Sequence, residues 1–141
     1  VVTHGEWSLI FIRGKFQHGI LKKPRKGNWL VQDELGGSVH WVKIEEEILR
    51  FAQNVISKIL PAHQKDRKNH STPPSKSHDP LYARVDILKT KWGLYLGEVE
   101  LIEPELFFLD RRVEPFRPFL PVVDAFCHEI ESSIAKGSLA L

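Results

Sequence analysis

Apolar and polar residues alternate along two neighbouring stretches near the middle of the chain, residues 82–88 and 94–103. Alternate side chains of a strand point to the same face, so this alternation predicts a β-hairpin. The face expected to be buried carries Ala83, Val85, Ile87, Tyr95, Val99 and Leu101. The opposite face carries four charged residues, Arg84, Asp86, Glu98 and Glu100. The same spacing places apolar residues among them, namely Tyr82, Leu88, Leu94, Leu96 and Ile102.

The turn of this hairpin predicts which charged residues face each other. A three-residue loop ending at a left-handed Gly93 is a common connection, and it places Asp86 opposite Glu98 and Arg84 opposite Glu100. Facing Cβ atoms are about 4.5–5.5 Å apart, a distance at which two ionised carboxylates repel unless a divalent cation or a raised pKa intervenes. Hard oxygen ligands of this kind suit Mg²⁺ or Mn²⁺.

A solvated sheet face is the simpler interpretation of such charges. The apolar neighbours favour a different one, in which the carboxylates line the floor of a cleft.

Similar patterns predict the remaining elements. Strands are expected over residues 6–12, 16–22 and 29–33, with a glycine turn over 13–15 and a basic loop over 22–28. Apolar residues at helical spacing predict a helix over 44–60, ended by Pro61, and a second helix begins near 118–122 and runs to 136. The polar residues 62–80 are expected to form a flexible loop. The predicted fold class is α+β, a mainly antiparallel sheet with two principal helices packed on one face.

Length and composition restrict the function. With 141 residues the chain is expected to form a single domain, residues 1–141. A net charge of +2 does not favour nucleic acid as a partner, and no stretch is apolar and long enough for a membrane span. The single cysteine, Cys127, excludes an internal disulfide and is typical of a reducing, cytoplasmic location. Because the chain lacks methionine and opens on an apparent strand, we expect it to be a fragment of a larger protein.

Several short motifs, in this order, resemble the ATP-grasp superfamily. They are Gly-Glu-Trp-Ser-Leu-Ile-Phe at 5–11, His-Gly-Ile-Leu-Lys-Lys-Pro at 18–24, Glu-Leu-Gly-Gly-Ser at 34–38, Arg-Val-Asp at 84–86 and Glu-Val-Glu at 98–100. The closest branch is the glutathione synthetase-like and ribosomal-protein glutamate ligase-like one. The resemblance covers roughly residues 5–110 and points to the C-terminal part of the ATP-grasp domain.

The resemblance implies an ATP-dependent ligase that joins a carboxylate to an amine or similar nucleophile through an acyl phosphate. By position, Asp86, Glu98 and Glu100 look like the ligands of two Mg²⁺ ions that hold the ATP phosphates, although many members have Asn in place of Glu100. Glu98 is thereby also an ATP-binding residue. Arg84 and Lys22 are similar to basic residues that bind ATP and contact the transferred phosphate. The segment 36–37 resembles part of a loop that closes over the substrates.

Elementary chemistry is consistent with this implication. Phosphoryl transfer needs metal ions that bridge phosphate oxygens, fixed basic groups and exclusion of water. An intact enzyme of this family has a preceding domain and a smaller subdomain that hold adenine and phosphates, and nothing in this chain corresponds to them. We therefore expect the isolated chain to bind Mg·ATP weakly and to catalyse little. Its expected partners are small carboxylate and amine substrates and the missing N-terminal portion.

Two other functions stay open. An Asp followed by two alternating acids on the next strand is also how Mg²⁺-dependent nucleases and phosphohydrolases hold metal. Those folds usually place a lysine at the alternate position after the last acid, where this chain has Ile102. The remaining alternative is a non-catalytic grasp-like binding module.

Overall fold

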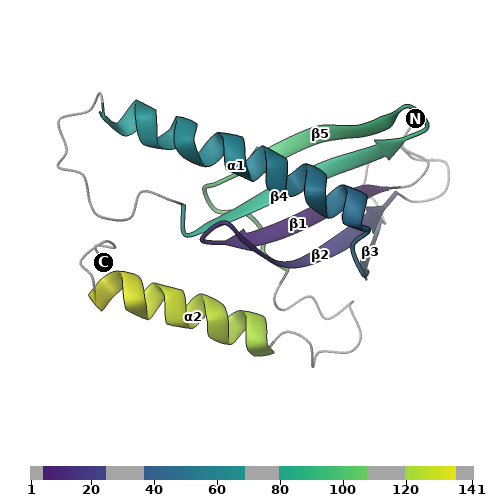
Figure 1. Cartoon of the computed structure of the whole chain (residues 1–141). Helices are drawn as coiled ribbons and strands as arrows, with labels where there is room; N and C mark the ends of the chain where they lie inside the picture. The colour runs from purple at the N-terminus through teal and green to yellow at the C-terminus, as the bar shows by residue number, and fades with distance from the viewer. Residues whose placement is uncertain (1–4, 25–36, 69–79, 108–119, 136–141) are drawn as a thin grey trace.

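The described residues form one antiparallel sheet of five strands and two helices, which confirms the predicted α+β class (Figure 1). The computed structural model describes residues 5–24, 37–68, 80–107 and 120–135. The strands lie in the order β3-β2-β1-β4-β5. The elements are β1 (Glu6–Ile12), β2 (Lys15–Lys23), β3 (Ser38–Trp41), α1 (Glu46–Lys68), β4 (Tyr82–Thr90), β5 (Gly93–Glu100) and α2 (Leu120–Ala135).

A tight turn joins β1 to β2. Arg13 and Gly14 both have positive φ, 48° and 72°, and Ile12 pairs with Lys15. Two left-handed residues are what a two-residue type I′ hairpin turn requires, and their twist matches that of the strands. The two strands predicted here are confirmed, with β2 one residue longer at each end than expected.

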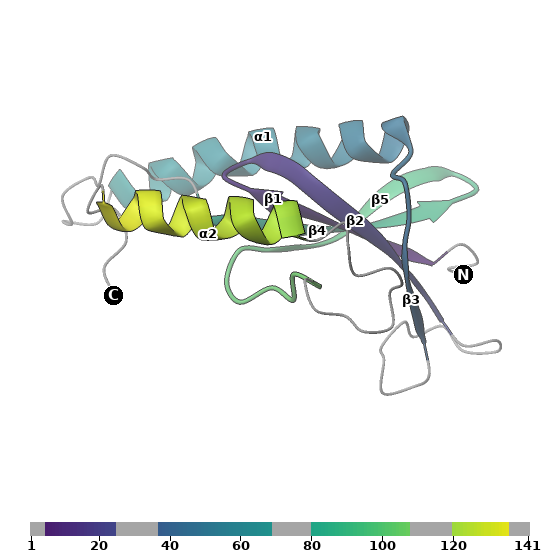
Figure 2. The same cartoon turned by 90° about the horizontal axis from the view of Figure 1, so that it is seen from below.

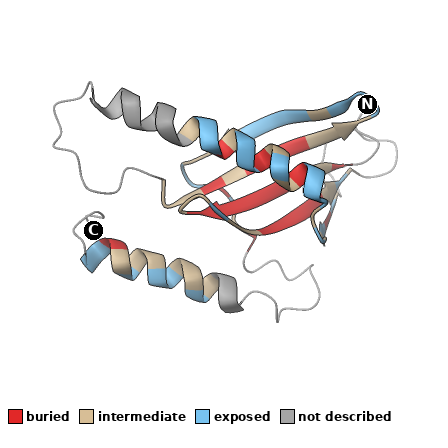
Figure 3. Ribbon diagram, in the orientation of Figure 1, coloured by how far each residue is buried: buried red, intermediate tan, exposed pale blue. Residues whose placement is uncertain are grey.

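The main core lies between the sheet and α1 (Figure 2). Alternate residues of β1 and β4 point toward this helix and are buried, namely Trp7, Leu9, Phe11, Ala83, Val85 and Ile87. The helix contributes Ile48, Ala52 and Ile56, which lie four residues apart and share one stripe of its surface. Colouring by burial shows these buried positions among intermediate and exposed ones in the described part of the helix (Figure 3).

Helix α1 is longer than predicted. It begins at Glu46 and continues to Lys68, so Pro61 lies inside the helix instead of ending it. Proline removes one backbone hydrogen bond, but the residues after it include good helix formers such as Gln64, Lys65 and Lys68. The predicted polar loop 62–80 consequently starts later, and residues 69–79 lie outside the described part of the chain.

The β4–β5 hairpin differs from the predicted one in its turn. Thr90 pairs with Gly93, so the loop has two residues instead of three, and Gly97 forms a bulge that shifts the register. Residues between turn and bulge therefore change faces. Leu94 packs on the α1 side, and Leu96 pairs with the buried Ile87. Placing these leucines with the carboxylates was therefore wrong.

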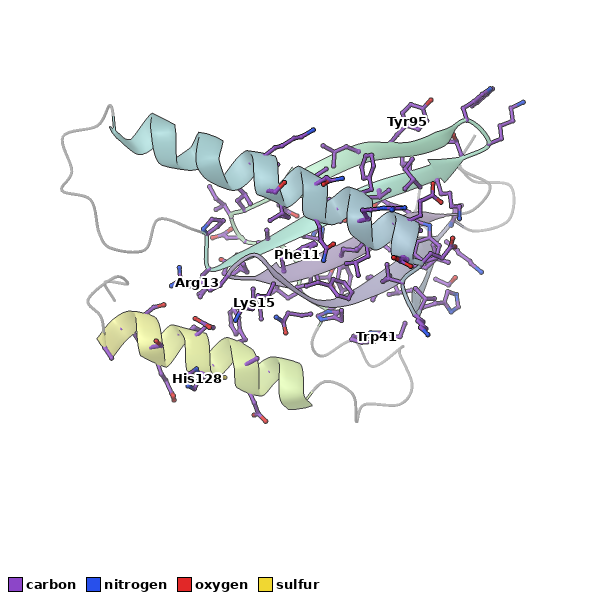
Figure 4. All side chains as sticks on the ribbon, in the orientation of Figure 1. Phe11, Arg13, Lys15, Trp41, Tyr95 and His128 are labelled. Atoms are coloured by element: carbon purple, nitrogen blue, oxygen red, sulfur yellow. The ribbon has the colours of Figure 1, made fainter. Side chains whose placement is uncertain are left out.

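Tyr95, between these two leucines, was also placed on the wrong face. It was expected to face the core, but it is 51% exposed and pairs with Leu88, and it projects outward from β5 (Figure 4). The predicted core positions Val99 and Leu101, which follow the bulge, do pack against the buried cluster.

Helix α2 contacts the sheet at the end formed by the β1–β2 turn and the start of β4. Arg13, in the β1–β2 turn (Figure 4), donates a hydrogen bond to Ser133 and pairs with Glu129 at 3.8 Å. Tyr82 packs on Phe126. The predicted strand at 29–33 lies outside the described residues. Within the described ranges, neither helix is both long and apolar enough to cross a membrane.

Candidate active site

Among the described residues, six charged side chains gather on the sheet face that points away from α1, and we call this surface the charged face. Its members come from β1, β2, β4 and β5 and are Glu6, Lys22, Arg84, Asp86, Glu98 and Glu100. Strand alternation explains the grouping, because these residues alternate with core residues on each strand. All five residues predicted as site residues from the sequence are among the six.

The predicted facing pairs are confirmed. Asp86 is in register with Glu98, and Arg84 with Glu100. The two acids of the first pair differ in environment, since Asp86 is 3% exposed whereas the Glu98 side chain is 61% exposed. A cation bound between them would contact one buried carboxylate and one carboxylate that is accessible to solvent.

Arg84 lies at the centre of the carboxylates. Its Nε donates to both Asp86 oxygens at 3.1 Å, and its Nη2 lies 2.5 Å from Glu100 Oε2 and 3.6 Å from Glu98 Oε2. Burial lowers the pKa of Arg84, but the charge of Asp86, the hydrogen bond to it, and the charges of Glu100 and Glu98 together raise it. The guanidinium is therefore a permanent cation that neutralises the predicted metal ligands.

Lys22 links the neighbouring strands to this group. Its Nζ pairs with Glu6 on β1, the strand beside it, and lies 3.6 Å from Asp86 Oδ2 on β4. The sequence interpretation missed Glu6. Its alternation with the apolar Trp7 and Leu9 in the predicted strand 6–12 is the signal that could have assigned it to this face.

The donor set fits a hard divalent cation in its chemistry, because Asp86, Glu98 and Glu100 offer only carboxylate oxygens from two paired strands. In the described ranges, however, no three His, Cys, Asp or Glu side chains are arranged as a ready metal site. The Arg84 contacts explain this, since the guanidinium lies where the three carboxylates converge. Of the predicted substrate loop at 36–37, residue 36 lies outside the described residues and residue 37 directly precedes β3.

A second group borders the charged face near β2 and β3. His18 is 4% exposed, stacks on Trp41 with ring centroids 4.6 Å apart, and its Nε2 donates to the Leu106 carbonyl at 2.9 Å. Burial lowers the pKa of His18 to about 4, and the Leu106 hydrogen bond opposes this only in part. The His18 ring thus stays neutral and fixes the segment after β5 against the sheet (Figure 2).

Strand β3, which supplies Trp41, was not predicted. It has only four residues, and its two polar members leave little periodic signal. Its Val39 and Trp41 nevertheless pack with Ile10, Ile20 and Phe107 in a small apolar cluster on the side away from α1.

Comparison with solved structures shows that the fold of the chain is similar to part of two ligases. The D-cycloserine synthetase DcsG superposes with a TM-score of 0.50 over 89% of this chain, at 20% sequence identity. The D-alanine–D-alanine ligase from Bacillus anthracis, complexed with ATP, superposes with a TM-score of 0.53 over 96% of this chain, at 12% identity. The fold is that of the C-terminal ATP-grasp subdomain.

The match is to part of each ligase only. The chain spans 39% of the length of DcsG and 38% of the D-alanine–D-alanine ligase. No protein-family model matches the chain, and no curated protein matches it in sequence. At these identities the likeness supports an ATP-grasp fold without selecting a branch of the superfamily.

Proposed function

We propose that the chain is the C-terminal, ATP- and Mg²⁺-binding part of an ATP-dependent ligase that activates a carboxylate as an acyl phosphate for attack by an amine or similar nucleophile. The observation that carries the proposal is the meeting of Arg84, Asp86, Glu98 and Glu100 on one face of an ATP-grasp subdomain. The shared fold favours this function over a nuclease.

Each site residue has a role in this proposal. Asp86, Glu98 and Glu100 hold Mg²⁺, which supplies charge neutralisation of the ATP phosphates when bound. Arg84 and Lys22 orient and neutralise the oxygens of the transferred phosphoryl group, and the planar fork of Arg84 suits a phosphate. Asp86 positions both basic groups, because it contacts the guanidinium and the Lys22 ammonium at once. We propose the glutathione synthetase-like branch from the motif order alone.

The remaining parts of the site belong to the longer protein in this proposal. The two matched ligases are more than twice as long as this chain, so the acyl and amine substrates are expected to be held largely by other segments. We therefore propose that the chain alone binds Mg·ATP weakly and turns over little.

Hydrogen exchange tests the proposal. Addition of ATP with Mg²⁺ is expected to slow amide exchange in β4 and β5, which carry the ligands, and to leave α2 unchanged. Asp86→Asn is expected to abolish the slowing, whereas Glu131→Gln, an exposed acid on α2, is the matched control. Unchanged exchange in β4 and β5 at saturating Mg·ATP would contradict the proposal, and cleavage of DNA with Mn²⁺ would favour a nuclease.

A further inference from the structure

The Arg84 guanidinium contacts the same carboxylates that a bound metal ion would contact. Arg84 pairs with Asp86, Glu98 and Glu100, the three carboxylates proposed as metal ligands. Its side chain is 12% exposed, so it lies among them and not at the rim. Lys22 adds a second cation at 3.6 Å from Asp86, and its own side chain is 15% exposed.

The acidic and basic side chains of the charged face do not balance each other in charge. Four carboxylates, Glu6, Asp86, Glu98 and Glu100, meet two basic groups, Lys22 and Arg84, so the formal charge is −2. One divalent ion would balance this charge. It could approach the carboxylate oxygens only if the basic groups moved away from them, because a cation and a guanidinium repel at such distances.

We propose that Arg84 and Lys22 are internal counter-ions of the metal site, and that a divalent cation and a polyphosphate bind the charged face cooperatively by exchanging partners with them. The inference rests on the proposed function and adds the expectation that neither ligand binds well alone. The cation takes the carboxylates from Arg84 and Lys22, and the phosphate oxygens take the released basic groups.

The energetics of buried charge drive the coupling. A metal ion that arrives alone leaves a largely buried guanidinium without an anion, which is costly. A polyphosphate that binds without the metal lies next to carboxylates of the same charge, and Arg84 is still paired with those carboxylates. When both arrive, every charge keeps a partner. By linkage, the metal must then raise the affinity for the polyphosphate by the same factor as the polyphosphate raises that for the metal.

Glu6 has a specific part in this exchange. It pairs with Lys22 from β1, the strand between β2 and β4, and it has no contact with Arg84 among the described ion pairs. Glu6 therefore keeps Lys22 beside Asp86 and is a positioning residue, not a metal ligand.

The test uses Mn²⁺ alone, measured by the paramagnetic resonance signal of the free ion. In Arg84→Gln the dissociation constant of Mn²⁺ without nucleotide is expected to fall about tenfold, equivalent to 1.4 kcal/mol. The enhancement of ATP binding by Mg²⁺ is expected to shrink in the same variant. Arg50→Gln, at an exposed arginine of α1, is the matched control and is expected to change neither quantity.

An unchanged or weaker Mn²⁺ affinity in Arg84→Gln overturns the inference. If the wild-type chain binds Mg·ATP but Arg84→Gln gains no Mn²⁺ affinity, the inference fails and the proposed function stands. If the wild-type chain binds no Mg·ATP, the proposed function fails as well.

A measurement on the wild-type chain keeps the inference testable should Arg84→Gln not fold. The Arg84 Nε–H resonance reports the bond to Asp86, and we expect it to shift when Mg²⁺ and ATP are added together, but only slightly with either alone. A resonance that does not move at saturating Mg·ATP contradicts the exchange.

Discussion

Asp86 on β4 faces Glu98 on β5, although the two-residue turn between their strands does not by itself bring them opposite each other. The turn pairs Thr90 with Gly93, a register that would place Asp86 opposite Gly97. The bulge at Gly97 absorbs one residue and restores the facing pair. Glycine suits the bulge because the backbone there lies close to β4. A Cβ atom at position 97 would lie only 3.3 Å from the Asp86 carbonyl oxygen.

Deletion of Gly97 should therefore be tolerated. Removal of the extra residue leaves Leu96 opposite Ile87 and Glu98 opposite Asp86, so every side chain keeps its face. We expect the free energy of unfolding in urea to fall by about 1 kcal/mol or less. Deletion of Val99 is the contrasting variant, because it turns Glu100 toward the core and should cost several times more. Equal losses in the two variants would contradict the bulge assignment.

Gly19 has a packing role on the α1 side of β2. A methyl group there would overlap the Ile44 side chain, which packs against the main core. Gly19→Ala is expected to lower the free energy of unfolding by about 1–3 kcal/mol through overpacking. Combination with Ile44→Val should recover part of this loss, as a double-mutant cycle would show. Additive effects of the two substitutions would rule out the clash as the cause.

The neutral His18 makes stability depend on pH. Its pKa of about 4 in the folded chain lies below the unfolded value of 6.5, so between these values the unfolded chain binds the extra proton. Stability should thus rise with pH through this window and fall by about 3 kcal/mol from pH 7 to pH 4 on account of His18. Urea unfolding at several pH values measures the slope.

His18→Gln is the matched variant for that slope. The glutamine amide can still donate to the Leu106 carbonyl but does not titrate in this range. We expect a flatter dependence of stability on pH between 4 and 6.5 than in the wild-type chain. The same slope in both chains would mean that other groups, and not His18, bind the proton.

The attachment of α2 depends on the β1–β2 turn. Arg13 contacts both Ser133 and Glu129 and has a φ of 48°, so Arg13→Gly removes the side chain without backbone strain. Amide exchange in α2 is expected to rise about tenfold, a loss near 1.4 kcal/mol, while exchange in β1 stays unchanged. Parallel increases in α2 and β1 would indicate general destabilisation instead.

The sequence predicted the charged face well because strand alternation acts residue by residue. Arg84, Asp86, Glu98 and Glu100 were assigned correctly, yet the assumed turn was wrong, and the unforeseen bulge at Gly97 compensated for it. Tyr95, between turn and bulge, received no such compensation and was placed on the wrong face. A bulge is invisible in such a pattern because glycine has no side chain to mark a face.

Other differences arise from long-range packing. Pro61 predicted a helix end, but α1 continues past it to Lys68. Glu6 and His18 acquire their roles from β2, β3 and the segment after β5, which are distant in the chain. Local periodicity contains no information about such partners, whereas the motif order did indicate the fold.

The affinity for ATP as a function of Mg²⁺ concentration tests the central claim most directly. Titration calorimetry should show that Mg²⁺ strengthens ATP binding to the wild-type chain, and that Asp86→Asn weakens Mg·ATP binding about tenfold or more while Glu131→Gln has no effect. The charged face is not an ATP and metal site if ATP binds equally with and without Mg²⁺, or if Asp86→Asn binds Mg·ATP as well as the wild-type chain does.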